Sequence, residues 1–402
     1  MPQHSIYREE VRSDLNDIPA EAWNALVPAD NPFFEYGFLY ALEASGCVGP
    51  ETSWHPRYVL LRDPAAEDRL IGAVALYFKF DSYGEYIFDH AWADAYMRSG
   101  LPYYPKGLVA APFTPTNGQR LLVHPDYEFK AVASRLIEVL LETTEEAGVS
   151  SLHLLFVTEE ESDLLRERGF LTRISTQFHW FNRGYECFDD FLGDLRSQKR
   201  KQLRKERRSV ADQGIDIQMI TGDAITPDMM ETMYRFYIDT GNRKWGQPYL
   251  NRRWFQLIRE HFRHRIVLAL AYLDGAIVAG TLNFHGGDKL YGRYWGASDE
   301  YPCLHFELCY YQLIDYAIQH GVKVFEAGAQ GEHKFLRGFE TRPCYSSHRM
   351  SHPEGQRAIR QFLETERDYI HQTIHGYNAQ SPLKHLRERE GGRETEPTKS
   401  RE

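Results

Sequence analysis

The densest group of reactive side chains in this sequence follows one short apolar run. Residues 321–325, GVKVF, lead into EAGAQGEHKFLRGF at 326–339, which combines glycines with an amide, acids, an imidazole and cations. A carboxylate at the end of a buried strand is partly desolvated, which raises its pKa and lets it accept a proton from an attacking amine. We therefore predict Glu326 as a general base; the alternative is that it only caps the backbone amides of the glycine turn.

Other side chains extend this predicted site. His305 and His333 are alternative proton carriers, because imidazole titrates near neutral pH. Cationic side chains would neutralise a phosphate or carboxylate of a ligand. The predicted ligand-binding residues are Lys334, Arg337, Gln330, Lys244, Trp245 and Tyr294. For the loop at 242–249, NRKWGQPY, an equal alternative is a tryptophan that fills the gap between two helices.

Familiar catalytic signatures are missing from the chain. It contains neither GxGxxG nor GxxxxGK[ST], and neither HExxH nor GxSxG, so nucleotide-loop, metalloprotease and α/β-hydrolase functions have no motif support. The five cysteines form no CxxC pair. Pairs such as His261 with His264, or His305 with Cys309, lack the three or four converging donors that a metal site needs, so we expect no metal.

Length and charge narrow the class of protein. A chain of 402 residues predicts two domains, and a net charge of −10 argues against general nucleic-acid affinity. The longest apolar runs are strand-sized and the N-terminus resembles no secretory signal, so we expect a cytoplasmic protein without a membrane span. Against this acidic background the basic run from Arg196 to Arg208 would suit tRNA, or would simply be a solvated helix.

An internal repeat organises the elements that carry these residues. Residues 71–78 and 86–93 resemble residues 277–284 and 290–297, and in each half we expect three strands joined by turns, then a helix and a fourth strand. The second helix would span about 304–320, with a strand at 322–326. Residues 174–181 would close the first domain, and further helices would begin at Pro227 and near residue 354.

The predicted architecture is α/β (α+β), with domains at 1–184 and 185–380 and a disordered charged tail at 381–402. The first domain carries an inserted loop rich in proline and aromatic residues near 94–128. Loops of this length are often functional, and the alternative is a packed loop that covers a sheet edge.

Two motifs in this order of elements are similar to the Fem-like family of tandem GNAT-fold proteins, the bacterial peptidoglycan biosynthesis/recognition type. Gln202-Leu203-Arg204-Lys205 resembles the family's basic N-I-R-K helix, and Phe335-Leu336-Arg337-Gly338-Phe339 resembles its F-K-x-G-F stretch, with Leu336 in place of lysine. The resemblance covers residues 1 to about 378. It implies two GNAT-like domains, each a mixed, largely antiparallel sheet flanked by helices.

The resemblance also implies transfer of an activated acyl group to an amine, such as an amine of a peptidoglycan precursor. The donor would be aminoacyl-tRNA or acyl-CoA, and no bound cofactor is required. Residues 296–305, GASDEYPCLH, depart from the Q/R-x-x-G-x-G/A loop that holds the CoA pyrophosphate, and Asp299 and Glu300 would repel it. The alternatives are a CoA-dependent N-acetyltransferase and a ligand-recognition module without catalysis.

Overall fold

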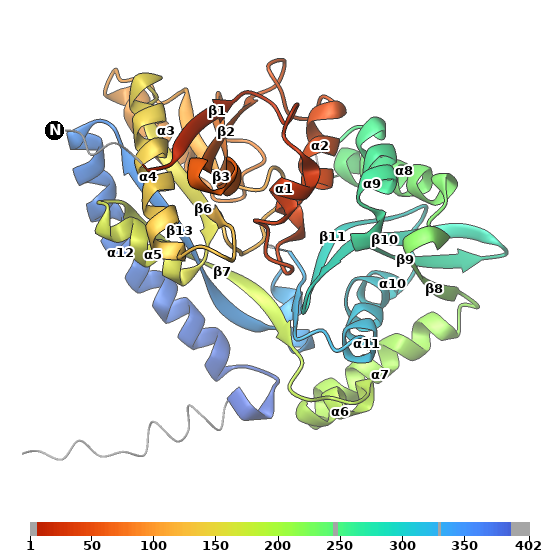
Figure 1. Ribbon diagram of the computed structural model, residues 1–402. Coiled ribbons are helices and arrows are strands. Elements are labelled where there is room, and N and C mark those ends of the chain that lie inside the picture. Colours follow the sequence, from red (N-terminus) through yellow and green to blue (C-terminus); the bar gives the residue numbers. More distant parts are fainter. Residues whose placement is uncertain (1–5, 244–247, 329–330, 387–402) are drawn as a thin grey trace, which may run out of the picture. The chain divides into compact units, whose positions relative to one another are not determined.

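The structure is a computed structural model that describes residues 6–243, 248–328 and 331–386. The chain forms two compact units built from interleaved segments (Figure 1). Unit 1 contains residues 1–175, 247–265 and 344–367, and unit 2 contains residues 176–246, 266–343 and 368–402. Each unit is described separately below. The division of the sequence at residues 184 and 185 remains a proposal about its repeated halves.

Unit 1 is built on a mixed sheet with the strand order β1-β2-β3-β4-β6-β13, and β5 pairs with β3. All pairs are antiparallel except β4 with β6, where Leu108 lies opposite His153. The strands are β1 (Arg8–Arg12), β2 (Trp54–Asp63), β3 (Arg69–Lys79), β4 (Lys106–Val109), β5 (Leu122–Val123), β6 (Ser151–Val157) and the end of β13 (Glu340–Met350).

One amphipathic helix covers much of this sheet. The helix α4 (Phe129–Glu146) packs on β2, β3, β5 and β6, because its apolar residues recur at three- and four-residue spacings and form one buried stripe. The other helices of unit 1 are α1 (Ala20–Asn24), α2 (Tyr36–Ala44), α3 (His90–Arg98), α5 (Glu159–Glu167), α9 (Arg252–His261) and the first half of α12 (Pro353–Ala379).

Unit 2 repeats this plan with the strand order β7-β12-β11-β10-β9-β8. The pair β11 with β12 is parallel and the others are antiparallel. The strands are β7 (Leu171–Phe181), β8 (Asp216–Thr221), β9 (Ile266–Leu273), β10 (Ala276–Gly286), β11 (Lys289–Ala297) and β12 (Val324–Glu326). The predicted sequence of three strands, helix and strand is therefore confirmed in the second half.

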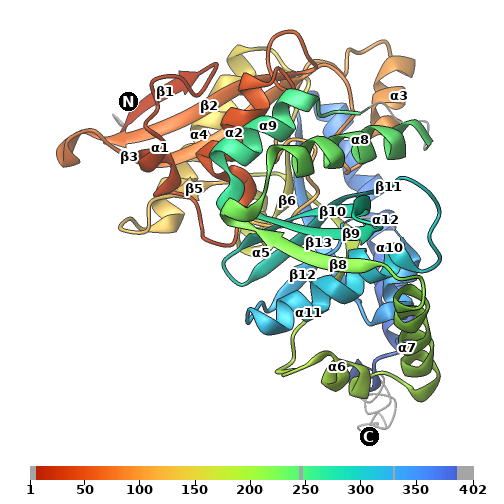
Figure 2. The same cartoon turned by 90° about the vertical axis from the view of Figure 1, so that its right-hand side faces the viewer.

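Helices lie on both faces of the unit 2 sheet. Figure 2 shows α8 (Pro227–Arg243) on one side of β8–β11 and α11 (Gln312–Gln319) on the other. Between β11 and α11 the chain forms α10 (Leu304–Phe306) and a π-helical turn at Glu307–Tyr311, so the predicted helix at 304–320 exists but is not regular. The helices α6 (Phe188–Asp194) and α7 (Ser197–Ala211) lie between β7 and β8 along the chain.

The closing strand of each unit comes from an unexpected part of the chain. We predicted that residues 174–181 close the sheet of the first half, but β7 pairs with β12 of unit 2, with Trp180 opposite Phe325. The corresponding place beside β6 of unit 1 is taken by β13, from the end of the second half. Both strands are long enough to begin in one unit and end in the other, which a local sequence pattern does not reveal.

The prediction for the first half was wrong between β3 and β4. Residues 86–93 do not form a strand: the chain turns at Tyr86, where φ is 64°, and then forms α3. Trp92, Ala93 and Tyr96 are buried on one side of this helix, so their spacing of three to four residues was helical. The predicted inserted loop at 94–128 contains β4 and β5, and β4 is the strand that corresponds to β11.

The described residues include the beginning of the predicted tail. Residues 381–386 follow α12, and Leu383 is buried in the unit 2 core, where it forms a bridge with Leu195. The remainder of the predicted tail, 387–402, lies outside the described residues. In the described ranges no helix combines the length and the apolar character required to cross a bilayer.

Candidate active site in unit 2

The two parallel strands of unit 2 separate after a short pairing. The strand β12 follows β11 only from Lys289 to Tyr291, while β11 continues to Ala297. At the point of separation β11 carries a bulge: Leu282 of β10 lies opposite Tyr294 and Asn283 opposite Gly292, so Arg293 is an additional residue. Bulges redirect a strand and its side chains. Here the bulge coincides with the end of β12, where the predicted site begins.

Glu326 is the last residue of β12 and is buried at 4% exposure. It lies between Tyr291 of β11 and His179 of β7. The Nε2 atom of His179 is 4.0 Å from the Glu326 carboxylate, but burial lowers the pKa of His179 to about 3, assisted by the positive charge of Lys289. His179 is therefore neutral at pH 7, and its contact with Glu326 is not an ion pair.

Lys334 is a buried ammonium group with few partners. The glycines at 328 and 331, with φ of 81° and 105°, turn the chain after β12 into the short helix Glu332–Arg337. Its Lys334 is 3% exposed, and the Nζ atom donates to the Gly328 carbonyl at 2.7 Å. No second hydrogen-bond partner of Nζ occurs among the described residues, although an ammonium has three donors. Burial lowers the pKa of Lys334 to about 8.

Arg337, in contrast, is saturated by the protein itself. Its guanidinium donates to both carboxylate oxygens of Glu206 in α7 at 3.0 and 3.1 Å, to the Tyr311 hydroxyl at 3.0 Å and to the His333 carbonyl at 3.0 Å. The guanidinium also lies 3.4 Å from the centre of the Phe306 ring. A side chain held by this many contacts positions its neighbours, so Arg337 fixes the short helix to α7.

The two predicted histidines lie close to each other. The ring centroids of His305 and His333 are 5.8 Å apart, and the His333 Nε2 atom is hydrogen-bonded to the Tyr310 hydroxyl at 2.8 Å. Burial raises the pKa of Tyr310, so this hydroxyl stays protonated and can donate to the imidazole. The arrangement suits a relay of protons between an imidazole and a phenol.

Glu326 points away from this histidine pair. The neighbouring Phe325 contacts Phe339, and Phe339 contacts Tyr310. Because successive side chains of a strand alternate between faces, Glu326 leaves the sheet on the face opposite to Phe325. The structure therefore brings together His305 and His333, and places Glu326 separately with His179 and Tyr291.

The other predicted residues have different positions. Tyr294 lies on β11 just after the bulge, with its ring 5.2 Å from that of Tyr237 in α8. Lys244, Trp245 and Gln330 lie outside the described residues. The described residues contain no group of three or more potential metal ligands.

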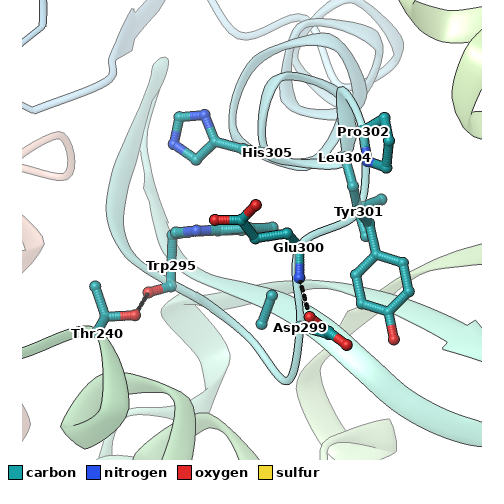
Figure 3. A pocket seen from close by; sticks show the side chains of 9 residues that line it. Thr240, Trp295, Asp299, Glu300, Tyr301, Pro302, Leu304 and His305 are labelled. Carbon is teal, nitrogen blue, oxygen red and sulfur yellow. Dashed lines mark hydrogen bonds between the residues drawn. The ribbon is translucent and has the colours of Figure 1, made fainter. Parts of the chain in front are cut away.

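A cavity of about 410 Å³ opens beyond the end of β11, beside His305 (Figure 3). Its floor is Trp295, whose carbonyl accepts a hydrogen bond from Thr240 at 3.0 Å, and the His305 ring contacts the Trp295 ring edge-on at 5.1 Å. The full lining is Thr240, Trp295, Ala297, Asp299, Glu300, Tyr301, Pro302, Leu304 and His305. This is the segment that departs from the CoA pyrophosphate loop, and its charged members are acidic.

Comparison with known proteins identifies the family. The model of the FemAB-like family, described as peptidoglycan biosynthesis/recognition, matches residues 14–385. The chain belongs to the FemAB-like family. No curated protein matches the sequence significantly.

Solved structures confirm the fold of this FemAB-like chain. FemX is 13% identical and matches 88% of this chain and 100% of its own, with a TM-score of 0.53. L-PGS from Bacillus licheniformis is 12% identical over 81% and 95%, with a TM-score of 0.50. The C-terminal domain of a putative lysylphosphatidylglycerol synthetase from Agrobacterium fabrum is 9% identical over 86% and 95%, with a TM-score of 0.52. The predicted α/β (α+β) architecture, with mixed, largely antiparallel sheets flanked by helices, is thus confirmed.

Several residues of the candidate site were not predicted from the sequence. His179 lies in the strand that we assigned to the first half, and Glu206 is the only acid within the basic helix α7. Tyr310 and Tyr311 fall in a helical stretch whose register is shifted by the π turn. Glu206 stands among the seven cations of α7, with Arg196 just before them. This was a usable signal, because an isolated opposite charge commonly marks a structural ion pair. The sequence of β7 contained no comparable signal for His179.

Proposed function

We propose that this protein transfers an activated acyl or aminoacyl group to an amine, and that unit 2 supplies most of the active site. The observation that carries the proposal is the buried Lys334 ammonium, which has one protein partner among the described residues and lies in the short helix Glu332–Arg337 that follows β12 along the chain. Burying a cation with few hydrogen-bond partners costs the folded protein free energy. Such a cation is typical of a site that binds an anion or stabilises a developing oxyanion.

In this proposal the protein positions the reactants and moves one proton. Glu326 accepts the proton of the attacking amine, directly or through a water molecule, as the amine nitrogen bonds to the acyl carbon. The ester bond between the acyl carbon and the ribose oxygen of the tRNA then breaks, and the proton passes to the leaving ribose oxygen. Lys334 stabilises negative charge on an oxygen of the donor or acceptor. The His333 and Tyr310 pair, with His305, provides an alternative route for the proton.

Aminoacyl-tRNA is the donor that the charges favour. The helix α7 buries Leu203 and Val210 and exposes Lys201, Arg204, Lys205 and Arg208, which suits the backbone of an RNA. The acidic lining of the cavity after β11 disfavours the pyrophosphate of CoA. An amine of a peptidoglycan precursor is the proposed acceptor, in keeping with the description of the family.

A transfer assay tests the proposal. The purified protein is incubated with UDP-linked muropeptide and with either a mixture of aminoacyl-tRNAs or acetyl-CoA, and the mass of the muropeptide is measured. We expect an added aminoacyl residue with the tRNA donor and no product with acetyl-CoA. An acetylated product would instead identify a CoA-dependent N-acetyltransferase. Muropeptide binding without a product from either donor would favour a recognition module.

A further inference from the structure

The cavity beyond β11 has the chemistry of a site for an organic cation. Its charged side chains are Asp299 and Glu300, and it has no lysine or arginine among its lining residues. Within the described part of the chain neither carboxylate forms an ion pair: the contact of Asp299 is with the backbone amide of Glu300, at 2.7 Å. Two carboxylates without cationic partners leave the cavity with a negative potential, which attracts a positive ligand.

The remaining walls suit a cation with an apolar stem. Trp295, Tyr301 and His305 supply ring surfaces, and Leu304 and Pro302 are apolar. In Figure 3 the Glu300 carboxylate lies between the Trp295 side chain and His305. Tryptophan is the side chain over which an ammonium binds best, and a cavity of about 410 Å³ is large enough for a small organic ligand.

We propose that this cavity binds a primary ammonium group carried on a short apolar chain. This deepens the proposed function and rests on it for the source of the ammonium, which is either the amino group of an aminoacyl donor or a side-chain amine of the acceptor. His305 connects the cavity to the His333 and Tyr310 pair. A ligand anchored here by its ammonium would therefore extend toward the proton-carrying side chains.

Binding is measured without turnover, by ligand-observed NMR with L-leucinamide as the cationic probe. N-acetyl-leucinamide has the same apolar stem without the charge, and inorganic pyrophosphate tests an anion. We expect leucinamide to bind at least about 5-fold more tightly than its acetylated analogue, the difference expected for one exposed charge pair and one ring contact. Equal binding of the two amides, no binding of leucinamide, or a pyrophosphate site in the cavity would overturn the proposal.

Variants locate the bound probe. The double change Asp299→Asn with Glu300→Gln keeps the shape of the cavity and removes its charge, and should weaken leucinamide binding about 5- to 10-fold. The double change Asp274→Asn with Asp288→Asn is the matched control, because it removes two carboxylates from the hairpin turns on either side of β10, and it should leave binding unchanged. An equal effect of both changes would show that only the net charge matters and would overturn the proposal.

Transfer kinetics distinguish the two sources of the ammonium. They also distinguish a failure of the cation site from a failure of the proposed function. If the aminoacyl donor supplies the ammonium, the double variant raises the KM for aminoacyl-tRNA and loses discrimination against an N-acetylated aminoacyl donor. If the acceptor supplies it, only the acceptor KM rises. Leucinamide binding that depends on the two carboxylates, in a protein without transfer activity, would refute the proposed function and leave the cation site intact.

Discussion

The buried charged side chains at corresponding edges of the two sheets differ in how completely the protein hydrogen-bonds them. In unit 1, β6 is followed by a capping box at Thr158 and by α5, and the fully buried Glu161 accepts hydrogen bonds from the backbone amides of Arg120, Leu121 and Thr158 at 2.6 to 3.0 Å. The Arg120 side chain is equally buried and donates to backbone carbonyls, including that of Leu155 at 2.9 Å. These buried charges have hydrogen-bond partners within the protein and stabilise this edge of the sheet.

In unit 2, β12 is followed by a glycine turn and a short 3₁₀ helix. Arg337 there is as well satisfied as Arg120, but Lys334 has only the Gly328 carbonyl among the described residues. Corresponding positions of the repeated fold thus carry a fully hydrogen-bonded structural group in unit 1 and a buried cation with few partners in unit 2. Polar groups that a fold leaves unsatisfied are where function is expected.

The largest expected effect is on catalysis and concerns Glu326. Replacing it by glutamine keeps the volume of the side chain and removes its ability to accept a proton, so kcat should fall about 100- to 10,000-fold. Glu159→Gln, at the matching strand end of unit 1, is the control and should not change kcat. Turnover in the transfer assay is the measurement, and a Glu326→Gln enzyme with normal kcat would remove Glu326 from the mechanism.

The next effect is on stability and concerns Glu161. Glu161→Ala leaves three buried amides without an acceptor and removes the carboxylate beside Arg120, so the free energy of unfolding should fall by about 3 kcal/mol. Urea unfolding measures this. Glu160→Ala, an exposed position in the same helix, should change the free energy by less than about 0.5 kcal/mol. Similar changes in the free energy of unfolding for both variants would contradict a structural role for Glu161.

Replacing Lys334 should change the free energy of unfolding in the opposite direction. Its pKa is lowered to about 8 by burial, whereas a lysine in the unfolded chain has a pKa of about 10.4. At pH 7 the folded protein therefore carries an unfavourable buried charge, and Lys334→Met should raise the free energy of unfolding by about 2 kcal/mol while transfer activity falls. A destabilised variant would mean that Lys334 is a structural group like Arg120.

The pH dependence of stability provides an independent check on Lys334. Between the folded pKa near 8 and the unfolded pKa of about 10.4, the unfolded chain binds more protons, so this group makes the wild type more stable as pH rises. The contribution is complete above the unfolded pKa and is lost as pH falls through the folded pKa. The advantage of Lys334→Met in urea unfolding should therefore shrink between pH 8 and pH 10; a constant advantage would assign it to better packing.

The two units also differ in how well the sequence predicted them. In unit 2 the turns Asp274-Gly275 and Gly287-Asp288 mark the hairpins directly, and β9–β12 were predicted with small errors in their ends. In unit 1 the helix α3 replaced a predicted strand, because residues 86–93 were matched to residues 290–297 of the repeat, whereas Trp92, Ala93 and Tyr96 have a helical spacing. Long-range pairing was not predictable: nothing local in residues 171–181 shows that β7 joins β12.

The same limit applies to the site. Glu326, His305 and His333 were proposed because their residue types suit proton transfer. The strand end at Glu326 and the helix at His305 followed from local patterns, whereas the short helix that carries His333 was not predicted. The separation of Glu326 from the histidines depends on which face of β12 each neighbour occupies, and the saturation of Arg337 depends on Glu206, which lies 131 residues away in the chain. Both are tertiary facts that residue type does not encode.

The smallest expected effect concerns the helices that connect the first two strands of each unit along the chain. In unit 1, α1 and α2 contain no lysine or arginine, whereas α7 of unit 2 exposes Lys201 and Lys205, neither of which forms an ion pair among the described residues. If α7 contacts the tRNA backbone, changing both lysines to glutamine should weaken aminoacyl-tRNA binding several-fold and reduce the slope of log affinity against log salt by about 1 to 2.

Two surface cations of unit 1 give the matched control for α7. Lys130→Gln with Arg166→Gln removes the same net charge from exposed positions, and should leave both the affinity and the salt slope unchanged. Fluorescence anisotropy with labelled tRNA, measured over a range of salt concentrations, distinguishes the cases. If the two double variants behave alike, α7 is a solvated helix, and the difference between the units is confined to the strand ends where Glu161 and Lys334 lie.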